Sequence, residues 1–525
     1  MPRIATHLLV QGQLNAADEH SVYNGLDCAL TQEIFGVLNK QIKQSNDPSA
    51  QLIYNFERGM QAPALSMMQR GFRIDQYQCR LGISQLQKRK AKCEYVLDRF
   101  AKAVWGKGLN PGSPKQMQQF FYYDPAGLCL PEQHKIEKGS RKVSTNRECL
   151  EKLSAYFFAQ PIINVVLAIR DCTKKLGVLT TEVDRDGRLR TAYNVAGTET
   201  GRWSSSSNAF GGGTNLQNIT PELRRMFVSD PGKKLCYLDL EQAESFIVGL
   251  LIWMCTGDSS YLDACESGDL HTGTCKLVWP HLPWSEDKKA SKALAEQPFY
   301  RSYSYRDMAK RGGHGTNYYG KPPTMAKHLK VEQPVMIDFQ NAYFKAYPGL
   351  GGPDGYGPQR MTWHKWTAQQ LQLHQVLTTP LGRRRHFFGR PGDDSTLREA
   401  IAFIPQSTVG DLLNLILYSF WKAGFELLAQ IHDAVVFQFP EAEEVAYTTK
   451  ALKLARIPIT VESLITPGAF RTITIPSECK TGWNWADETI KTSLGKKINN
   501  SDGLRKWAGK PDERKRLEGL ARIVS

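Results

Sequence analysis

Two apolar runs that lie far apart in the chain each lead to an aspartate. Residues 235–240 carry Asp239 near their end, and a helical pattern of non-polar residues follows within a few positions. Further on, the apolar runs 425–431 and 434–439 leave only His432 and Asp433 between them, which predicts a β-hairpin with the second aspartate at its tip. The pattern therefore predicts that strands of a sheet present two carboxylates.

A single aspartate after a strand is more often a turn former or a helix N-cap than a metal ligand. Two such residues in matching settings favour another interpretation, because carboxylates on neighbouring strands can hold two Mg²⁺ ions about 3.5–4 Å apart. Such a pair of ions activates an attacking hydroxyl and stabilises a leaving phosphate. Asp239 and Asp433 are thus candidate ligands of a two-metal centre.

Between the two aspartates, polar residues recur at every fourth position, as Arg306, Lys310, His314 and Tyr318. This spacing places them on one face of a helix, where two cations would suit a triphosphate. Three glycines in the same stretch each weaken a helix by about 1 kcal/mol relative to alanine, which argues against a continuous helix.

Composition narrows the class of protein. The chain of 525 residues carries a net charge of +15 and is 41% apolar, which is typical of a large globular protein with an acidic partner such as nucleic acid. Its 11 cysteines include no C-x-x-C pair, so reduced thiols in the cytoplasm are expected rather than a zinc site or a disulfide framework. Because the apolar runs are too short to cross a bilayer and no signal-peptide pattern begins the chain, no membrane partner is expected.

Three motifs follow one another in a distinctive order. They are Asp239-x-x-Gln242-x-Glu244, then the pattern from Arg306 to Tyr318, then His432-Asp433. In this order they resemble the three polymerase motifs of family A DNA polymerases, the bacterial polymerase I class and its phage relatives. Further segments that resemble the family are Thr200-Gly201-Arg202-Trp203-Ser204-Ser205, Asn215-Leu216-Gln217-Asn218, Asp269-Leu270-His271, Tyr343-Phe344, Tyr347-Pro348-Gly349, Arg398 and Gln406. The resemblance covers roughly residues 55 to 486.

The resemblance implies an α+β fold shaped like a right hand, in which an antiparallel palm sheet lies between a helical thumb and helical fingers. The expected divisions are a remnant of the C-terminal segment of an exonuclease domain (1–55), the thumb (56–190), the first part of the palm (191–257), the fingers (258–395), the second part of the palm (396–487) and a basic C-terminal extension (488–525).

The resemblance also assigns residues to the reaction. Asp239, Asp433 and Lys310 are the expected catalytic residues, and the main-chain carbonyl of Leu240 joins the two aspartates as a metal ligand. The expected nucleotide-binding residues are Arg306, Lys310, His314, Tyr318, Glu244, Gln242 and His271. The expected DNA-binding residues are Arg202, Arg398, Gln406, His432 and Asn218. The implied cofactors are two Mg²⁺ ions, for which Mn²⁺ can substitute.

Glu244 and Tyr318 are expected to close the sugar pocket. In the family, the matching pair forms a hydrogen bond and fills the space that a 2′-hydroxyl would need, which implies DNA rather than RNA synthesis. The sequence also departs from the family pattern. His314 stands where Phe or Tyr is general, an extra residue, Tyr319, precedes the next glycine, and Ala434 replaces a glutamate that often follows the second aspartate. The extra residue leaves open which tyrosine closes the pocket.

The two ends of the chain carry separate expectations. Residues 21–27 and the helical pattern after them resemble the last motif of the 3′–5′ exonuclease domain that precedes many family A polymerases. Too few carboxylates lie upstream for that domain's own metals, so we expect no proofreading and interpret the segment as a packing helix or as one piece of an arrangement split over two chains. Residues 488–525 are basic and poor in apolar positions, which favours a solvated, partly helical extension.

The sequence thus predicts template-directed transfer of deoxynucleotides to a primer 3′-hydroxyl, with release of pyrophosphate. The expected partners are a DNA primer–template and deoxynucleoside triphosphates, with a separate exonuclease chain or a processivity factor as further candidates. Two other functions stay open, a single-subunit RNA polymerase, which would lack the pair of Glu244 and Tyr318, and a non-catalytic DNA-binding scaffold for replication. The variant motifs favour a phage source and hence the cytoplasm of an infected bacterial host.

Overall fold

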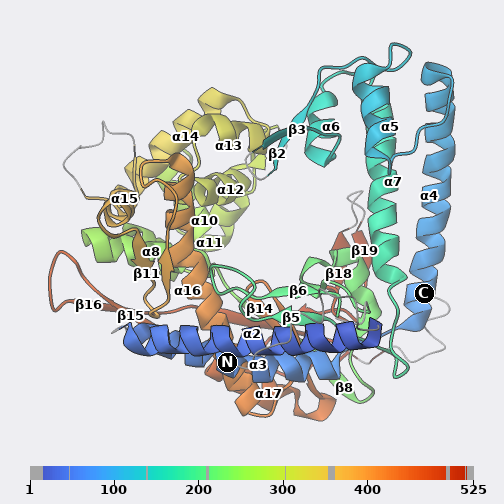
Figure 1. The fold of residues 1–525 in the computed structure, drawn as a ribbon. Coiled ribbons are helices and arrows are strands. Elements are labelled where there is room, and N and C mark those ends of the chain that lie inside the picture. Colours follow the sequence, from blue (N-terminus) through green and yellow to red (C-terminus); the bar gives the residue numbers. More distant parts are fainter. Residues whose placement is uncertain are drawn as a thin grey trace.

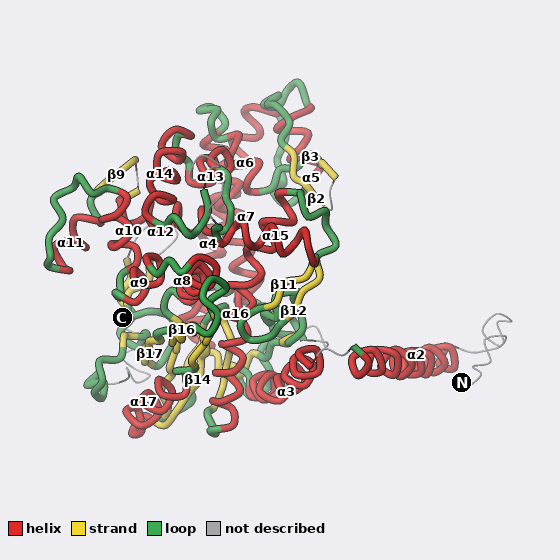
Figure 2. Tube along the Cα trace, turned by 90° about the vertical axis from the view of Figure 1, so that its left-hand side faces the viewer, coloured by secondary structure: helices red, strands yellow, loops and turns green. Residues whose placement is uncertain are grey.

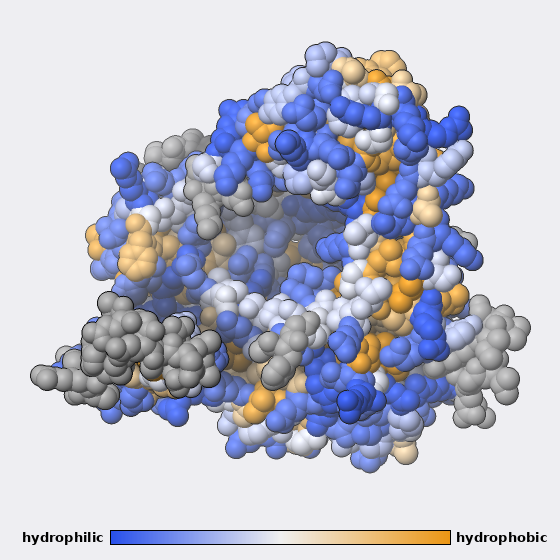
Figure 3. Space-filling model, turned by 45° about the vertical axis from the view of Figure 1, so that its right-hand side comes forward, coloured by the Kyte–Doolittle hydropathy of each residue, from blue (hydrophilic) through white to orange (hydrophobic). Residues whose placement is uncertain are grey.

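The fold is taken from a computed structural model, which describes residues 16–45, 48–137, 140–208, 212–301, 303–352, 361–491, 497–514 and 516. A sheet lies at the base of the molecule, and two mainly helical lobes rise from it (Figure 1). Figure 3 shows a central hollow between them, whose visible walls are mostly hydrophilic. Helices and antiparallel sheets are both present, which confirms the predicted α+β class.

The base is a five-stranded antiparallel sheet in the order β13-β14-β8-β17-β20. Its strands are β8 (Lys233–Leu240), β13 (Glu426–Ile431), β14 (Ala434–Pro440), β17 (Ser477–Gly482) and β20 (Arg505–Lys506). The predicted hairpin is confirmed, since only His432 and Asp433 separate β13 from β14. Asp239 is the partner of Ala434 in the register of β8 and β14, so both aspartates lie at the same end of neighbouring strands.

Helices cover one face of this sheet. They are α8 (Ala243–Thr256), α16 (Asp394–Lys422) and α17 (Glu444–Leu454), and they bury alternate residues of β8, such as Cys236 and Leu238, in the main core. Among the described residues, α16 is the one helix long and apolar enough to cross a membrane, and 83% of its apolar window is buried inside the protein. Its apolar side chains therefore serve the core.

One lobe, in the region predicted as the thumb, consists mainly of two long helices that run side by side, α4 (Gln76–Trp105) and α7 (Gln160–Leu179) (Figure 1). Its outer end contains α5 (Pro114–Gln118), the π-helix η1 (Gln119–Tyr123), the hairpin of β2 (His134–Glu137) and β3 (Ser140–Val143), and α6 (Arg147–Leu153). Its base is the small sheet of β4 (Arg188–Leu189), β1 (Phe72–Ile74) and β7 (Phe227–Val228).

The opposite lobe, in the region predicted as the fingers, consists of shorter helices. They are α9 (Ser260–Glu266), α10 (Leu270–Val278), α11 (Lys288–Ala295), α12 (Tyr305–Asn317), α13 (Pro322–Leu329), α14 (Gln333–Ala346) and α15 (Trp363–His374). The hairpins of β9 (Pro298–Tyr300) with β10 (Tyr303–Ser304) and of β11 (Val376–Thr378) with β12 (Arg384–His386) complete it.

Smaller elements complete the fold. They are the hairpin of β5 (Ala192–Asn194) and β6 (Ser204–Ser206), the 3₁₀ turns η2 (Leu216–Asn218), η3 (Pro221–Met226) and η4 (Glu441–Glu443), and the hairpin of β15 (Pro458–Glu462) and β16 (Phe470–Thr474).

Helix α12 is continuous, so the doubt that its glycines raised was wrong. A capping box at Ser304 begins the helix. A Cβ atom at Gly312 would lie 2.6 Å from the ring of Phe339, and one at Gly313 would lie 3.0 Å from the ring of Tyr343. The glycines therefore allow α12 to pack closely on α14, and this packing outweighs their low helix propensity.

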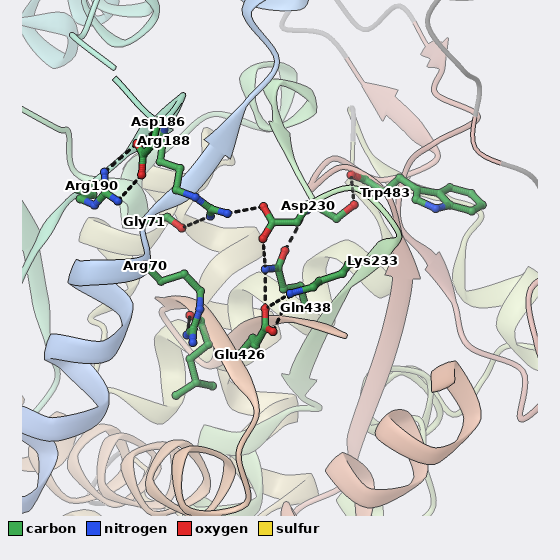
Figure 4. A network of polar contacts seen from close by, with 12 residues as sticks. Arg70, Gly71, Asp186, Arg188, Arg190, Asp230, Lys233, Glu426, Gln438 and Trp483 are labelled. Carbon is green, nitrogen blue, oxygen red and sulfur yellow. Dashed lines mark hydrogen bonds and ion pairs between the residues drawn. The ribbon is translucent and has the colours of Figure 1, made fainter. Parts of the chain in front are cut away.

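A polar network fixes the base of the thumb region to the far end of the sheet (Figure 4). Arg188 donates to Asp230 at 2.5 Å, and Gln438 donates to the same carboxylate at 2.8 Å. Glu426 accepts from Gln438 and from Lys233, both at 2.7 Å. Because these side chains are partly buried and share partners, the network holds the lobe at a defined angle to the sheet.

Near the N-terminus, α2 (Ala16–Gln44) extends away from the body of the protein and α3 (Pro48–Arg70) lies against it (Figure 2). Residues 21–27 are helical. The described part of this segment does not pack on the rest of the protein as a packing helix would, because Leu30 and Ile34 are 53% and 57% exposed. Residues 1–15 of the predicted remnant lie outside the described residues. A split exonuclease stays a prediction.

The C-terminal extension is not helical in its described part, contrary to the prediction. Strand β18 (Thr489–Lys491) pairs with β19 (Lys497–Asn499), and β20 adds to the edge of β17. Leu504 is only 4% exposed, and the main-chain N–H of Trp507 donates to the carbonyl of Cys479 at 2.9 Å. Single apolar residues hold the extension on the sheet without a periodic pattern, which is why the sequence indicated a solvated segment. Residues 492–496, 515 and 517–525 of this extension lie outside the described part.

Candidate active site

The two predicted carboxylates meet where the chain leaves the sheet. The N–H of Leu240 donates to the main-chain carbonyl of Asp433 at 3.3 Å, which joins the end of β8 to the hairpin tip. The turn that follows β8 is sharp, because Gln242 adopts a left-handed backbone conformation with φ of 54°. The turn between β13 and β14 is sharp for the same reason, since His432 has φ of 50°. Such angles cost about 1–3 kcal/mol each for residues other than glycine and are found most often at functional sites.

Burial and like charges perturb both carboxyl groups. Burial and, after it, the charges of Asp433 and Glu478 together raise the pKa of Asp239 to about 6. Burial also raises the pKa of Asp433, although the Arg202 guanidinium opposes that change. The neighbouring carboxyl groups of Asp239 and Asp433 both resist ionisation. They therefore form a favourable environment for a cation, since a positive charge relieves the repulsion between the two carboxylates.

The donor set fits Mg²⁺. Among the described residues, no group of three or more His, Cys, Asp or Glu side chains has the arrangement of a metal site. A cation held by Asp239 and Asp433 would therefore take its other ligands from the carbonyl of Leu240, from water and from a bound phosphate. Mg²⁺ commonly binds in this way, through one or two carboxylates and substrate phosphates, and keeps several waters.

A cavity of about 370 Å³ opens beside Asp433. The predicted residues that line it are Leu240, Gln242, Glu244, His271, Lys310, His314 and Asp433. One lining residue, Gln242, has a buried side-chain oxygen, Oε1, with no hydrogen-bond partner within the described protein. Buried polar atoms are normally paired, so the cavity is prepared for a polar ligand.

Helix α12 contributes Lys310 and His314 to the lining of this cavity, whereas Arg306 and Tyr318 of the same predicted face do not line it. Arg306 donates to Asp269 at 3.1 Å, and the ring of His314 meets the ring of Tyr318 edge-on at 4.9 Å. Burial and, after it, the cations Arg306 and Lys310 together lower the pKa of His271 to about 4. His271 is therefore a neutral imidazole near pH 7 and can donate a hydrogen bond from one nitrogen.

Glu244 connects the helix to the aspartates. The hydroxyl of Tyr318 donates a short hydrogen bond to one oxygen of Glu244, and Arg202 donates to the other at 2.6 Å. The same guanidinium nitrogen of Arg202 lies 3.4 Å from Asp433. Burial and the adjacent Glu244 carboxylate raise the pKa of Tyr318 well above its ordinary value, so its hydroxyl stays protonated as the donor.

The extra residue Tyr319 faces another part of the protein. Its backbone is left-handed, with φ of 61°. Its ring lies 5.4 Å from the ring of His364 and 4.0 Å from the ammonium of Lys321. Of the two tyrosines, Tyr318 is therefore the one in contact with Glu244.

The predicted DNA-binding residues are more dispersed. Arg202 contacts Glu244 and Asp433, whereas His432 at the hairpin tip and Asn218 at the end of η2 are exposed. Arg398 is exposed and donates to the carbonyl of its own helix at Asp394, and Gln406 follows about 12 Å further along α16. Arg398 and Gln406 do not line the cavity.

Sequence reasoning missed the residues that support the hairpin tip. Gln217 donates to the side chain of Gln430 at 2.7 Å, and Gln430 donates to the carbonyl of His432 at 2.8 Å. Gln217 lies in a segment that resembles the family, which was the available signal. A second omission is Glu478, the partner of Asp239 in the register of β17 and β8. The alternation of polar and buried residues along the strand that follows Pro476 could have indicated Glu478.

Comparison with known proteins agrees with this geometry. The sequence model that describes DNA polymerase family A matches residues 83–487 of this chain. The chain belongs to DNA polymerase family A. Curated relatives include the thermostable DNA polymerase I of Thermus thermophilus, 27% identical over 411 residues, and that of Thermus aquaticus, 27% identical over 463 residues. These matches cover 73% and 83% of this chain, and 44% and 50% of the relatives. This family A chain thus spans about half the length of the curated relatives it matches.

A solved structure shares the fold. It is the POL domain of Pol1 from M. smegmatis in complex with DNA primer-template and dNTP, with a TM-score of 0.62 and 22% identity. The similarity covers 82% of this chain and 69% of that one. The relatives named here are bacterial, so a phage source for this family A polymerase stays a prediction.

Proposed function

We propose that this chain is a template-directed DNA polymerase that adds deoxynucleotides to a primer 3′-hydroxyl. The observation that carries the proposal is a cavity whose lining brings Asp433 together with Lys310, His271 and His314. Membership of DNA polymerase family A and the likeness of the fold to a polymerase domain solved with primer-template and dNTP support the same partners. The region between the lobes would hold the DNA, with residues 56–190 as thumb, 191–257 and 396–487 as palm and 258–395 as fingers.

Asp239, Asp433 and the carbonyl of Leu240 would hold Mg²⁺, with Mn²⁺ as a substitute. Two such ions lower the pKa of an attacking hydroxyl and stabilise the charge of a leaving pyrophosphate. The two carboxylates must be ionised for this role, and the rise in the pKa of Asp239 to about 6 implies that metal binding weakens in acid.

The nucleotide would lie with its phosphates against α12. Lys310 and Arg306 supply positive charge, and His271, being neutral, donates a hydrogen bond to a phosphate oxygen without adding charge. Lys310 lines the same cavity as Asp433 and is our candidate for giving a proton to the departing pyrophosphate. His314 and Gln242 complete the walls, and the unpartnered oxygen of Gln242 can accept a hydrogen bond from the sugar or from water.

Selection of deoxyribose would depend on the pair of Glu244 and Tyr318. Their hydrogen bond fixes Tyr318 to Glu244, which lines the cavity, and a 2′-hydroxyl beside Glu244 would collide with the pair. Tyr319 is turned toward His364 and is not a candidate for this role.

Primer and template would be contacted by Arg202, Arg398, Gln406, His432 and Asn218. Arg202 lies between the sugar pocket and Asp433, which suits a residue that tests the base pair at the primer end. The net charge of +15 favours binding to the phosphate backbone, and such binding should weaken steeply with salt.

The test is extension of a labelled primer on a DNA template with Mg²⁺, with deoxynucleotides in one reaction and ribonucleotides in another. Extension with deoxynucleotides alone is the expected result. Asp239→Ala and Asp433→Ala should lose nearly all extension while primer–template binding in a gel-shift assay is largely retained. Efficient extension with ribonucleotides would favour an RNA polymerase, and tight binding without extension by the wild-type chain would favour a scaffold.

A further inference from the structure

Asp239 has a neighbour on each side within the sheet, and only one of them carries charge. Its partner on β14 is Ala434, and its partner on β17 is Glu478. Residues directly opposite each other in antiparallel strands project to the same face of the sheet. Asp239 and Glu478 therefore project side by side, on the face opposite the covering helices, while the alanine on the other side supplies no ligand.

The C-terminal extension places a cation on this second carboxylate. Strand β20 pairs with β17 so that Lys506 is the partner of Lys480. The ammonium of Lys506 lies 2.7 Å from Glu478 and 3.8 Å from Glu241. The side chain of Glu478 is 21% exposed and that of Lys506 is 68% exposed, so the pair sits at the rim of the site. Lys506 lies beyond residue 487, where the match to the family model ends.

The charge at the proposed metal site makes a further carboxylate useful. Two divalent cations would bring four positive charges, whereas Asp239 and Asp433 supply two negative ones. Arg202, 3.4 Å from Asp433, adds more positive charge. Mg²⁺ keeps several of its waters, and those waters need fixed hydrogen-bond acceptors. Groups that hold metal-bound ligands in this way commonly change metal affinity or activity by about 10–100-fold when they are lost.

We propose that Glu478 is a positioning residue of the metal site, which accepts hydrogen bonds from metal-bound water beside Asp239, and that Lys506 of the extension holds the Glu478 carboxylate in place. This inference rests on the proposed function. Glu478 does not bind the metal directly, consistent with the lack of a three-residue ligand cluster among the described residues. The extension beyond the family match thereby becomes part of the catalytic apparatus.

The experiment measures Mn²⁺ binding to the whole chain by electron paramagnetic resonance, without DNA or nucleotide, so that it does not depend on turnover. Glu478→Gln should raise the dissociation constant of Mn²⁺ by about 10-fold. Lys506→Gln should raise it by a smaller factor, about threefold, because water can partly replace an exposed ammonium. Lys506→Arg should bind as the wild type does. The matched control is Glu488→Gln, which removes a carboxylate paired with the neighbouring Arg505.

The outcomes are distinguishable. Wild-type affinity in Glu478→Gln, or an equal loss in Glu488→Gln, would overturn the inference, provided that circular dichroism and the melting temperature show folded proteins. Primer extension by the same variants should show a matching rise in the half-saturating Mg²⁺ concentration. If the wild-type chain extends primers and Glu478→Gln binds Mn²⁺ normally, only this inference fails. If the wild-type chain extends no primer, the proposed function fails, and the Mn²⁺ titrations still decide the role of Glu478.

Discussion

Replacing Asp239 by asparagine should stabilise the metal-free protein at neutral pH. In the folded chain the pKa of this carboxyl is raised from 3.8 to about 6, so folding opposes its ionisation. The unfolded chain ionises the group near pH 4, whereas the folded chain retains the proton up to about pH 6. Stability is therefore fully present below the unfolded pKa, falls between about pH 4 and pH 6, and stays low at pH 7.

The rise in pKa corresponds to about 3 kcal/mol at most. Asp239 is only partly buried, and solvent screening reduces this to about 1–2 kcal/mol. Asparagine resembles the protonated acid in shape and carries no charge, so Asp239→Asn should recover that energy at pH 7.5 and recover none at pH 4. The substituted protein should melt at a higher temperature than the wild type in EDTA.

The assay is thermal unfolding in EDTA at several pH values between 4 and 8, with Asp263→Asn as the control because Asp263 is an exposed carboxylate of α9. The difference in melting temperature between Asp239→Asn and the wild type should grow with pH over this range, and it should shrink when Mg²⁺ is added, because the ion stabilises only the wild type. A substituted protein that is equally stable or less stable than the wild type at pH 7.5 would refute the reasoning.

Three further results are expected. Glu244→Ala should admit ribonucleotides and lower the preference for deoxynucleotides by at least tenfold, measured as the ratio of kcat/KM values; an unchanged ratio would argue against a sugar gate. Gly312→Ala should destabilise the protein by about 1–3 kcal/mol through overpacking, whereas Gly177→Ala in α7, where a Cβ meets nothing within 4 Å, should be neutral or stabilising by up to about 1 kcal/mol; melting temperatures compare the two. Asp411→Ala should cost about 1–3 kcal/mol in chemical denaturation, because the buried guanidinium of Arg383, 2.8 Å from Asp411, would keep only Glu57 as an ion-pair partner. A loss below about 1 kcal/mol would contradict this.

The sequence was sufficient to predict the elements that carry the aspartates. Apolar runs separated only by His432 and Asp433 predict a hairpin from the local sequence alone. The spacing of polar residues from Arg306 to Tyr318 was regular enough to identify one polar face of a helix. The family resemblance predicted the pair of Glu244 and Tyr318, which the structure shows in contact. These features depend on local pattern or on ordered motifs, and both are visible in one chain.

Features that depend on packing between distant segments could not be predicted. The glycines of α12 looked like helix breakers because Phe339, the ring that requires Gly312, lies on another helix. The role of Arg202 as a partner of both Glu244 and Asp433 follows from folding that joins residues more than 200 positions apart. The C-terminal strand was missed because two residues, Arg505 and Lys506, are too short a strand to leave a periodic pattern.

That short strand also has a consequence for solubility. An unpaired edge strand is a template onto which other chains can add, and proteins commonly protect such edges with short, positively charged strands. Strand β20 pairs with the edge of β17 through Lys506 and Arg505, and it offers only two residues for pairing with a strand of another molecule. On this side the five-stranded sheet thus ends in a strand too short and too charged to be extended, which should keep concentrated protein from associating through this edge.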